Sequence, residues 1–297
     1  MALMKRFHIT DVFGSDKYTG NQLATFVDAG DMAEEEMQRI ACEIHFSETT
    51  FVHAGGDEAG GWKVRIFTPE KEVDFAGHPV LGTAYVIQKT MMDQPAGEIF
   101  LHMKTGFIRV RFPGQDDGGM LWMQQNEPAF GPSVNHSHVT EVLSLTDDDM
   151  DTNWPVEEVS TGLPHMIVPV KKLDALKKVV LNMPAYVRFI QERRAKSILV
   201  FAPEGYEKNQ TIAVRVFPAA YGIAEDPATG SGNGCLAAYL VRHRYFLRER
   251  IDILAGQGYE IGRPSVLALR AGETGNTIHV EVGGRVFYIA GGDWEIS

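Results

Sequence analysis

In the stretch Glu225-Asp-Pro-Ala-Thr-Gly-Ser-Gly-Asn-Gly-Cys-Leu-Ala-Ala-Tyr-Leu240, an acidic loop passes through three glycines into an apolar helix. Glycine lets a ligand approach the backbone closely, and a helix N-terminus favours negative charge. The stretch therefore predicts an anion-binding helix start at Gly230, Ser231 and Gly232. It lacks the lysine of a P-loop, and the long loop before it does not fit a dinucleotide fingerprint.

A similar helix start is expected in the first half of the chain, at Ala76-Gly-His-Pro79. Pro79 suits a first helical turn, and apolar residues at helical spacing follow it. Gly77 allows close backbone approach, and His78 can donate, accept or shuttle a proton. A histidine at such a position is more often a cap or a surface residue. Paired with the second helix start, however, it suggests that two helix N-termini converge on one anionic ligand.

The two helix starts belong to a longer internal repeat. Arg65-Ile-Phe67 precedes an acidic loop, a glycine and a helix, and Arg215-Val-Phe217 precedes the same series half a chain later. Self-similarity of this kind is typical of duplication. The sequence therefore predicts two similar halves that contain both helices and strands.

Hydrophobic periodicity predicts strands around both helices. The expected strands are 6–13, 23–27, 47–52, 62–67, 98–103, 106–111, 120–124, 161–170, 197–202, 211–217, 265–269, 277–282 and 285–290. A glycine-rich turn at 55–61 would join two of them. Asp31 and Glu34 suggest a capping box before a helix that continues to Ile44, and another helix is expected at 183–194. The polar stretch 127–153 suggests a crossover between domains.

Composition limits the class of protein. The chain has 297 residues, of which 44% are hydrophobic and 23% charged, which is typical of a globular protein with a substantial core. Its net charge of −11 argues against binding to nucleic acid or to an anionic membrane. The two cysteines form neither a disulfide framework nor a zinc ligand set, and no apolar run approaches a membrane span. We expect no metal site and a cytoplasmic location.

A third segment, Ser47-Glu-Thr49, lies between an expected helix and an apolar strand. A carboxylate that points inward from such a place would be desolvated, and its pKa would rise. A raised pKa would let Glu48 take and return protons near neutral pH. The alternative, a surface glutamate at the start of a strand, stays open on these residues alone.

Taken in order, these motifs resemble the phenazine-biosynthesis protein F (PhzF) family, over essentially the whole chain. The residues that carry the resemblance are Asp11-Val-Phe, Gly20-Asn21, Met37-Gln-Arg-Ile-Ala41, Ser47-Glu-Thr49, Arg65-Ile-Phe-Thr-Pro69, Ala76-Gly-His-Pro79, Glu225-Asp-Pro-Ala-Thr-Gly-Ser231, Gln257-Gly258, Gly262-Arg-Pro-Ser265 and Val282-Gly-Gly284.

The resemblance implies an α+β fold related to diaminopimelate epimerase. Two similar lobes are expected, each a curved, mostly antiparallel, barrel-like sheet around a central helix, with the active site in the cleft between them. The first lobe would comprise residues 1–125 and 286–297, and the second lobe residues 126–285. Family members are commonly homodimers, which makes a homodimer the expectation here.

The resemblance also implies site residues. Glu48 would be the general acid/base, with Asp226 and His78 assisting it and Ser231 contacting the substrate. The backbone at Gly77, Gly230 and Gly232 would hold a carboxylate on the small-molecule substrate. The two thiols of the epimerases would fall near Ala76 and Ser231, which argues against two-thiol racemisation.

The implied reaction needs no cofactor, and in the family's namesake it isomerises trans-2,3-dihydro-3-hydroxyanthranilate. Two alternatives remain from the sequence: an isomerase or epimerase of another small amino or hydroxy acid, and a non-catalytic binding protein of the same fold.

Overall fold

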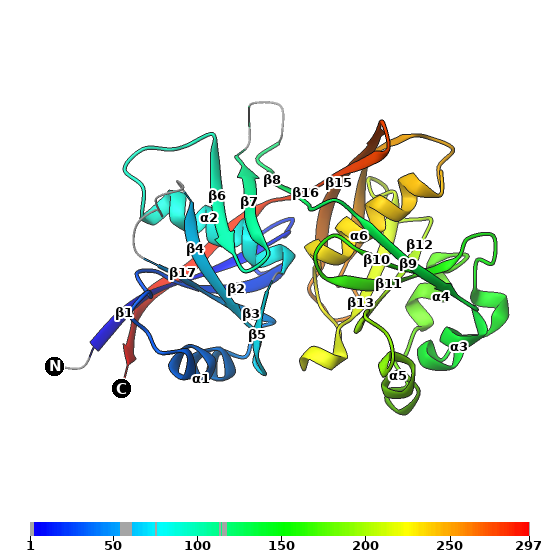
Figure 1. The fold of residues 1–297 in the computed structure, drawn as a ribbon, viewed down its shortest axis with the longest axis horizontal. Helices are drawn as coiled ribbons and strands as arrows, with labels where there is room; N and C mark the ends of the chain where they lie inside the picture. The colour runs from blue at the N-terminus through cyan, green and yellow to red at the C-terminus, as the bar shows by residue number, and fades with distance from the viewer. Residues whose placement is uncertain (1–2, 54–60, 75, 113, 115–117, 297) are drawn as a thin grey trace. The chain divides into compact units, whose positions relative to one another are not determined.

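The computed structural model describes residues 3–53, 61–74, 76–112, 114 and 118–296. The chain divides into two compact units, one made of residues 1–124 and 283–297 and the other of residues 125–282 (Figure 1). Each unit therefore has its own internal architecture, and the first is completed by the C-terminal segment.

The first unit is a curved sheet with one helix inside it. Its strands run in the order β17-β1-β2-β3-β4-β6-β7-β8, in which β2–β3 and β4–β6 are parallel pairs and the other neighbours are antiparallel, while β5 extends β4 as a short hairpin. In Figure 1, β17 in red runs beside β1 in blue. Its elements are β1 (Leu3–Val12), β2 (Asn21–Phe26), α1 (Glu34–Ile44), β3 (Glu48–Val52), β4 (Trp62–Phe67), β5 (Glu72–Val73), α2 (Gly77–Thr90), β6 (Glu98–Met103), β7 (Gly106–Arg111), β8 (Leu121–Gln124) and β17 (Val286–Ile296).

The second unit repeats this plan. Its strands from β9 to β15 run in the order β9-β10-β11-β12-β13-β14-β15, in which β11–β12 and β13–β14 are parallel pairs and the other neighbours are antiparallel. Its elements are β9 (Ala129–Val134), α3 (Ser137–Leu143), η1 (Asp147–Asp149), β10 (Val156–Ser160), β11 (Pro164–Pro169), α4 (Leu173–Lys178), α5 (Met183–Ile190), β12 (Ser197–Ala202), β13 (Ile212–Phe217), η2 (Ala219–Tyr221), α6 (Gly230–Arg242), β14 (Arg250–Gln257), β15 (Ser265–Thr274) and β16 (Thr277–Gly284).

The repeat extends to individual side chains. Arg65 of β4 pairs with Glu72 at 2.8 Å and lies over the ring of Phe67 at 5.1 Å. Arg215 of β13 pairs with Glu225 at 2.7 Å and lies 5.1 Å from the centre of the Phe217 ring. In both units the ion pair closes the acidic loop that leads into the central helix. Two similar lobes, as the sequence predicted, are therefore present.

The central helices are buried on nearly every side. All residues of α6 from Gly230 to Val241 are buried, and in α2 the first eight residues from Gly77 are buried as well. A helix that is apolar all round belongs inside a core, and here the strands of its own unit surround it. The outer helices instead bury one stripe. In α1, for example, Met37, Ile40 and Ala41 pack against the aromatic cluster on β2, β3 and β4.

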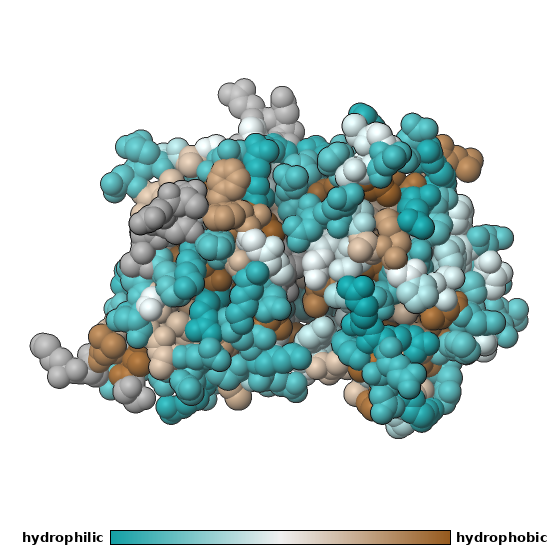
Figure 2. All heavy atoms as spheres, in the orientation of Figure 1, coloured by the Kyte–Doolittle hydropathy of each residue, from teal (hydrophilic) through white to brown (hydrophobic). Residues whose placement is uncertain are grey.

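The surface is mostly polar. Figure 2 shows hydrophilic side chains over most of the visible face of each unit, with hydrophobic ones alone or in small groups, which is ordinary for a water-exposed surface. Among the described residues, the longest apolar helices fall short of the length needed to cross a bilayer.

Some sequence predictions were wrong. The helix α1 begins after Ala33 without a side-chain cap, and Asp31 pairs with Lys5 instead of forming a capping box. The polar stretch 127–153 is part of the second unit, because it supplies β9 and α3, whose Val142 and Leu143 are buried. The strands β10 and β14 and the helix α4 were missed. The turn predicted at 55–61 lies outside the described residues, except for Gly61.

The tight contact between α2 and the sheet can be tested at Gly82. A Cβ atom there would lie 2.5 Å from Leu23 Cδ2 and 2.9 Å from Val12 Cγ2, both in the core. We expect Gly82→Val to lower the free energy of unfolding by about 1–3 kcal/mol through overpacking, as measured by urea denaturation. Gly97→Val is the matched control, because nothing lies within 4 Å of its Cβ position. Equal stability of the two variants would contradict this packing.

Candidate active site

In the first unit, the structure places Glu48 beside His78. Glu48 opens β3 and its side chain is 14% exposed, while His78 is the second residue of α2 and is 2% exposed. Their Oε2 and Nδ1 atoms lie 3.5 Å apart, and the same Nδ1 lies 3.1 Å from the Asn21 amide nitrogen. Three segments that are distant in sequence therefore bring a carboxylate, an imidazole and an amide together.

A buried hydrogen-bond chain holds β3 against the central helix. The Thr83 hydroxyl of α2 donates to Thr50 of β3 at 2.9 Å, and Thr50 donates to Thr25 of β2 at 3.0 Å. All three side chains are fully buried. Because Thr50 is two residues from Glu48, these bonds fix the distance between the carboxylate and the start of α2.

His78 is neutral at physiological pH. Burial lowers its pKa to about 3, against a weaker opposing effect of a hydrogen bond with the Gln22 backbone. The contact between His78 and Glu48 is therefore a dipolar contact rather than an ion pair. A neutral imidazole next to a carboxylate can hold a hydrogen bond or pass a proton without carrying a net charge.

In the second unit, Asp226 is held in the loop before α6. Its Oδ2 atom accepts a hydrogen bond of 2.6 Å from the Thr229 hydroxyl, and its backbone N–H donates to Val216. Gln257 of β14 is fully buried and donates to both the Asp226 carbonyl and the Thr229 hydroxyl, at 2.8 and 3.0 Å. Gln257 therefore ties the acidic loop to the sheet and fixes the direction of the carboxylate.

Ser231 is the second residue of α6 and is 2% exposed. Its Oγ atom lies 3.3 Å from Nε2 of His165, a buried residue of β11. Sequence reasoning missed His165, because a single histidine in an apolar strand reads as packing. The only available signal was a titratable side chain at an inward-facing strand position.

Both central helices begin without a capping side chain among the described residues. The N-cap of α2 is Ala76, which has no side-chain acceptor, and the N-cap of α6 is Thr229, whose hydroxyl is engaged with Asp226. The N–H groups of a first helical turn have no partner within the helix. The backbone at Gly77, Gly230 and Gly232 thus belongs to two helix starts whose geometry suits an anion.

The cysteines do not supply a reactive thiol at these helix starts. Cys235 is buried inside α6, and burial raises its pKa to about 12, so that the thiol stays protonated. Cys42 is exposed on α1. Within the described part of the chain, no group of three His, Cys, Asp or Glu side chains is placed to hold a metal ion.

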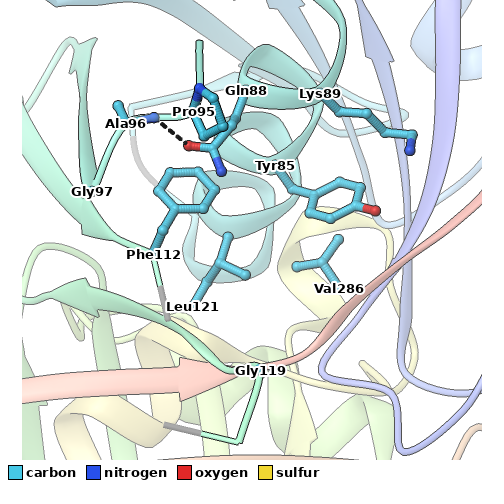
Figure 3. A pocket seen from close by; sticks show the side chains of 10 residues that line it. All are labelled: Tyr85, Gln88, Lys89, Pro95, Ala96, Gly97, Phe112, Gly119, Leu121 and Val286. Carbon is cyan, nitrogen blue, oxygen red and sulfur yellow. Dashed lines mark hydrogen bonds between the residues drawn. The ribbon is translucent and has the colours of Figure 1, made fainter. Parts of the chain in front are cut away.

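A cavity of about 450 Å³ lies elsewhere in the first unit (Figure 3). Tyr85, Gln88 and Lys89 of α2 line it together with Phe112, and Gln88 accepts a hydrogen bond from the Ala96 N–H. At 1.5 Å per residue, Tyr85 is about 12 Å along α2 from its start at Gly77. This cavity is therefore separate from the predicted site residues, none of which lines it.

Comparison with known proteins agrees with this architecture. Residues 10–292 match the family of phenazine biosynthesis-like proteins, PhzC-PhzF. The chain is 35% identical over 285 residues to trans-2,3-dihydro-3-hydroxyanthranilate isomerase of Pseudomonas aeruginosa. The aligned region covers 95% of this chain and 96% of that protein.

Solved structures show the same relationship. A PhzF-family phenazine biosynthesis protein of Bacillus anthracis superposes with a TM-score of 0.89 at 26% identity, over 99% of this chain and 100% of its own. A hydroxyproline epimerase of Agrobacterium vitis shares the fold at 9% identity, with a TM-score of 0.68 over 100% of this chain and 94% of that one. The chain is therefore an isomerase. It belongs to the phenazine biosynthesis-like PhzC-PhzF family.

The buried histidines should make stability depend on pH. His78 and His165 both have pKa values lowered to about 3 by burial, against 6.5 ordinarily. Below pH 6.5 these two histidines bind protons in the unfolded chain but stay neutral in the folded chain. The free energy of unfolding therefore falls as the pH falls toward 3. Each histidine adds up to about 1.4 kcal/mol per pH unit to the slope of the unfolding free energy against pH in this range.

We expect His165→Gln to reduce the slope of the unfolding free energy against pH by up to about 1.4 kcal/mol per pH unit between pH 6 and 4, because one of the two buried histidines is removed. Urea denaturation at several pH values measures the slope. His138→Gln, at an exposed position, should follow the parent protein. A His165→Gln slope identical to that of the parent would show that His165 is not buried in the neutral form.

Proposed function

We propose that this protein moves a proton between two carbon atoms of a small carboxylate-bearing substrate, without a cofactor, and that Glu48 carries the proton. The observation that supports this best is the Glu48–His78 contact at 3.5 Å, where a mostly buried carboxylate adjoins a neutral imidazole at the start of a buried helix. A carboxylate that is shielded from water and adjoins a neutral imidazole suits general acid/base catalysis.

In the proposed reaction, the Glu48 carboxylate removes a proton from an activated carbon and becomes a carboxylic acid. The electron pair left behind is delocalised through the substrate, and the same carboxylic acid then returns the proton to a different carbon. The substrate formula is unchanged and Glu48 is regenerated as the carboxylate. His78 and Asp226 hold the amino or hydroxyl groups of the substrate, and Ser231, with the backbone at Gly77, Gly230 and Gly232, binds its carboxylate.

The favoured substrate is trans-2,3-dihydro-3-hydroxyanthranilate or a close relative. This choice is supported by the identity to the Pseudomonas isomerase over nearly the whole chain. Another small amino or hydroxy acid is the second candidate, and the fold shared with the hydroxyproline epimerase favours it. Two-thiol epimerisation has no support here, since Ala76 and Ser231 stand at the helix starts and Cys235 is a buried, protonated thiol.

Deuterium incorporation from heavy water, followed by NMR, tests the proposal. The purified protein is incubated with trans-2,3-dihydro-3-hydroxyanthranilate and with a panel of small amino and hydroxy acids. We expect exchange or rearrangement of one substrate, and a decrease of about 10²–10⁴-fold in kcat for Glu48→Gln, because general acid/base catalysis typically contributes that much.

Glu43→Gln, on the exposed side of α1, is the matched control and should retain full activity. Unchanged turnover in Glu48→Gln would remove Glu48 from the mechanism. A folded parent protein that exchanges no compound of the panel would contradict the proposed substrate class.

A further inference from the structure

His165 lies against the first turn of α6. Its side chain is 1% exposed, and Nε2 lies 3.3 Å from Ser231 Oγ. The adjoining Cε1–Nδ1 edge of the ring faces Gly232, where a Cβ atom would lie 3.3 Å from both Cε1 and Nδ1. The imidazole thus lies along the helix start and contacts it at two consecutive residues.

In the internal repeat, a leucine occupies the position that is equivalent to His165. In the second unit, His165 of β11 pairs in parallel register with Ser197, and in the first unit Leu23 of β2 pairs in the same way with Glu48. Leu23 also faces a glycine of its central helix, Gly82. A leucine therefore fills the equivalent position, whereas a buried imidazole must compensate for its own desolvation.

The environment selects one tautomer of His165. Burial lowers the pKa of His165 to about 3, so that the ring is neutral and carries one N–H. Nδ1 has no hydrogen-bond partner within the described residues, and Nε2 has only Ser231. A buried N–H without a partner is rarer in proteins than an unused acceptor. The hydrogen therefore belongs on Nε2, which donates it to Ser231 Oγ.

This direction of donation leaves the hydroxyl hydrogen of Ser231 available. A serine within a helix can donate to the carbonyl four residues earlier. Ser231, however, is only the second helical residue, so that no preceding helical turn competes for its hydrogen. With Oγ acting as the acceptor toward His165, the O–H must donate elsewhere. An anion bound at the start of α6 is the natural acceptor.

We propose that His165 is a positioning residue that makes the Ser231 hydroxyl a dedicated hydrogen-bond donor to the carboxylate of the substrate. This inference rests on the proposed function, because it assigns the carboxylate of that substrate to the start of α6. The imidazole does not touch the substrate and acts only through Ser231.

Binding of anthranilate, an unreactive aromatic carboxylate, tests the assignment by isothermal titration calorimetry. We expect Ser231→Ala and His165→Leu each to weaken anthranilate binding by about 10- to 100-fold, the usual range for a hydrogen bond to a charged group. The double variant should be no weaker than Ser231→Ala alone, because one interaction is removed in both cases. His165→Gln, which keeps an N–H donor, should recover part of the affinity.

Anthranilamide provides the control for charge. Its binding should change little in all these variants, since it has no carboxylate. Unchanged anthranilate affinity in His165→Leu, or losses that multiply in the double variant, would overturn the proposal. A general loss of structure is recognised by equal weakening of anthranilate and anthranilamide, and it would also count against a specific role.

Nitrogen-15 NMR of the parent protein gives a second readout that is independent of any variant. It should show the His165 hydrogen on Nε2 and not on Nδ1, and a hydrogen on Nδ1 would overturn the proposal even if His165→Leu fails to fold. Neither measurement needs turnover. If deuterium exchange fails while the variants change anthranilate binding as expected, the proposed reaction is rejected but the role of His165 is not. If deuterium exchange occurs while His165→Leu leaves anthranilate binding unchanged, only the role of His165 is rejected.

Discussion

Each central helix is buried on nearly every side, so that its first turn is the main part left for a ligand, and the rest of this structure follows from that constraint. In each unit the sheet curves around one central helix, and the side chains of the helix are used for packing. The contact is close where a strand side chain meets the helix backbone at a glycine, as at Gly82 and Gly232. What remains for chemistry is the first turn of the helix, with its N–H groups and the loop residues around it.

Burial also decides the electrostatic character of these helix starts. Both carry an imidazole that is kept neutral, His78 in α2 and His165 beside α6. Neither can serve as a positive charge that neutralises a bound anion. Attraction for a carboxylate must come instead from backbone dipoles and from neutral donors such as the Ser231 hydroxyl.

The duplicated framework shows how one architecture acquires two different roles. Equivalent positions at the start of a strand hold Glu48 in the first unit and Ser197 in the second, and the paired positions hold Leu23 and His165. The Arg–Glu pair that closes the acidic loop is kept in both units. The two units share the same strand pairing but differ in the side chains at equivalent positions. The first unit can therefore carry the proposed proton donor and acceptor, while the second carries the proposed carboxylate contacts.

The sequence by itself determined the elements with strong local signals. The helix starts at Gly77 and Gly230 and the strands β6, β7 and β12 follow from glycine placement and hydrophobic alternation, which act over a few residues. The motif order also identified the family. The capping of α1 and the roles of β9 and α3 depended on distant partners, so that local patterns misled. Only the tertiary structure brought Glu48 to His78, Gln257 to Asp226 and His165 to Ser231, because each contact joins segments whose approach is set by strand pairing and by the burial of a whole helix rather than by any neighbouring residue.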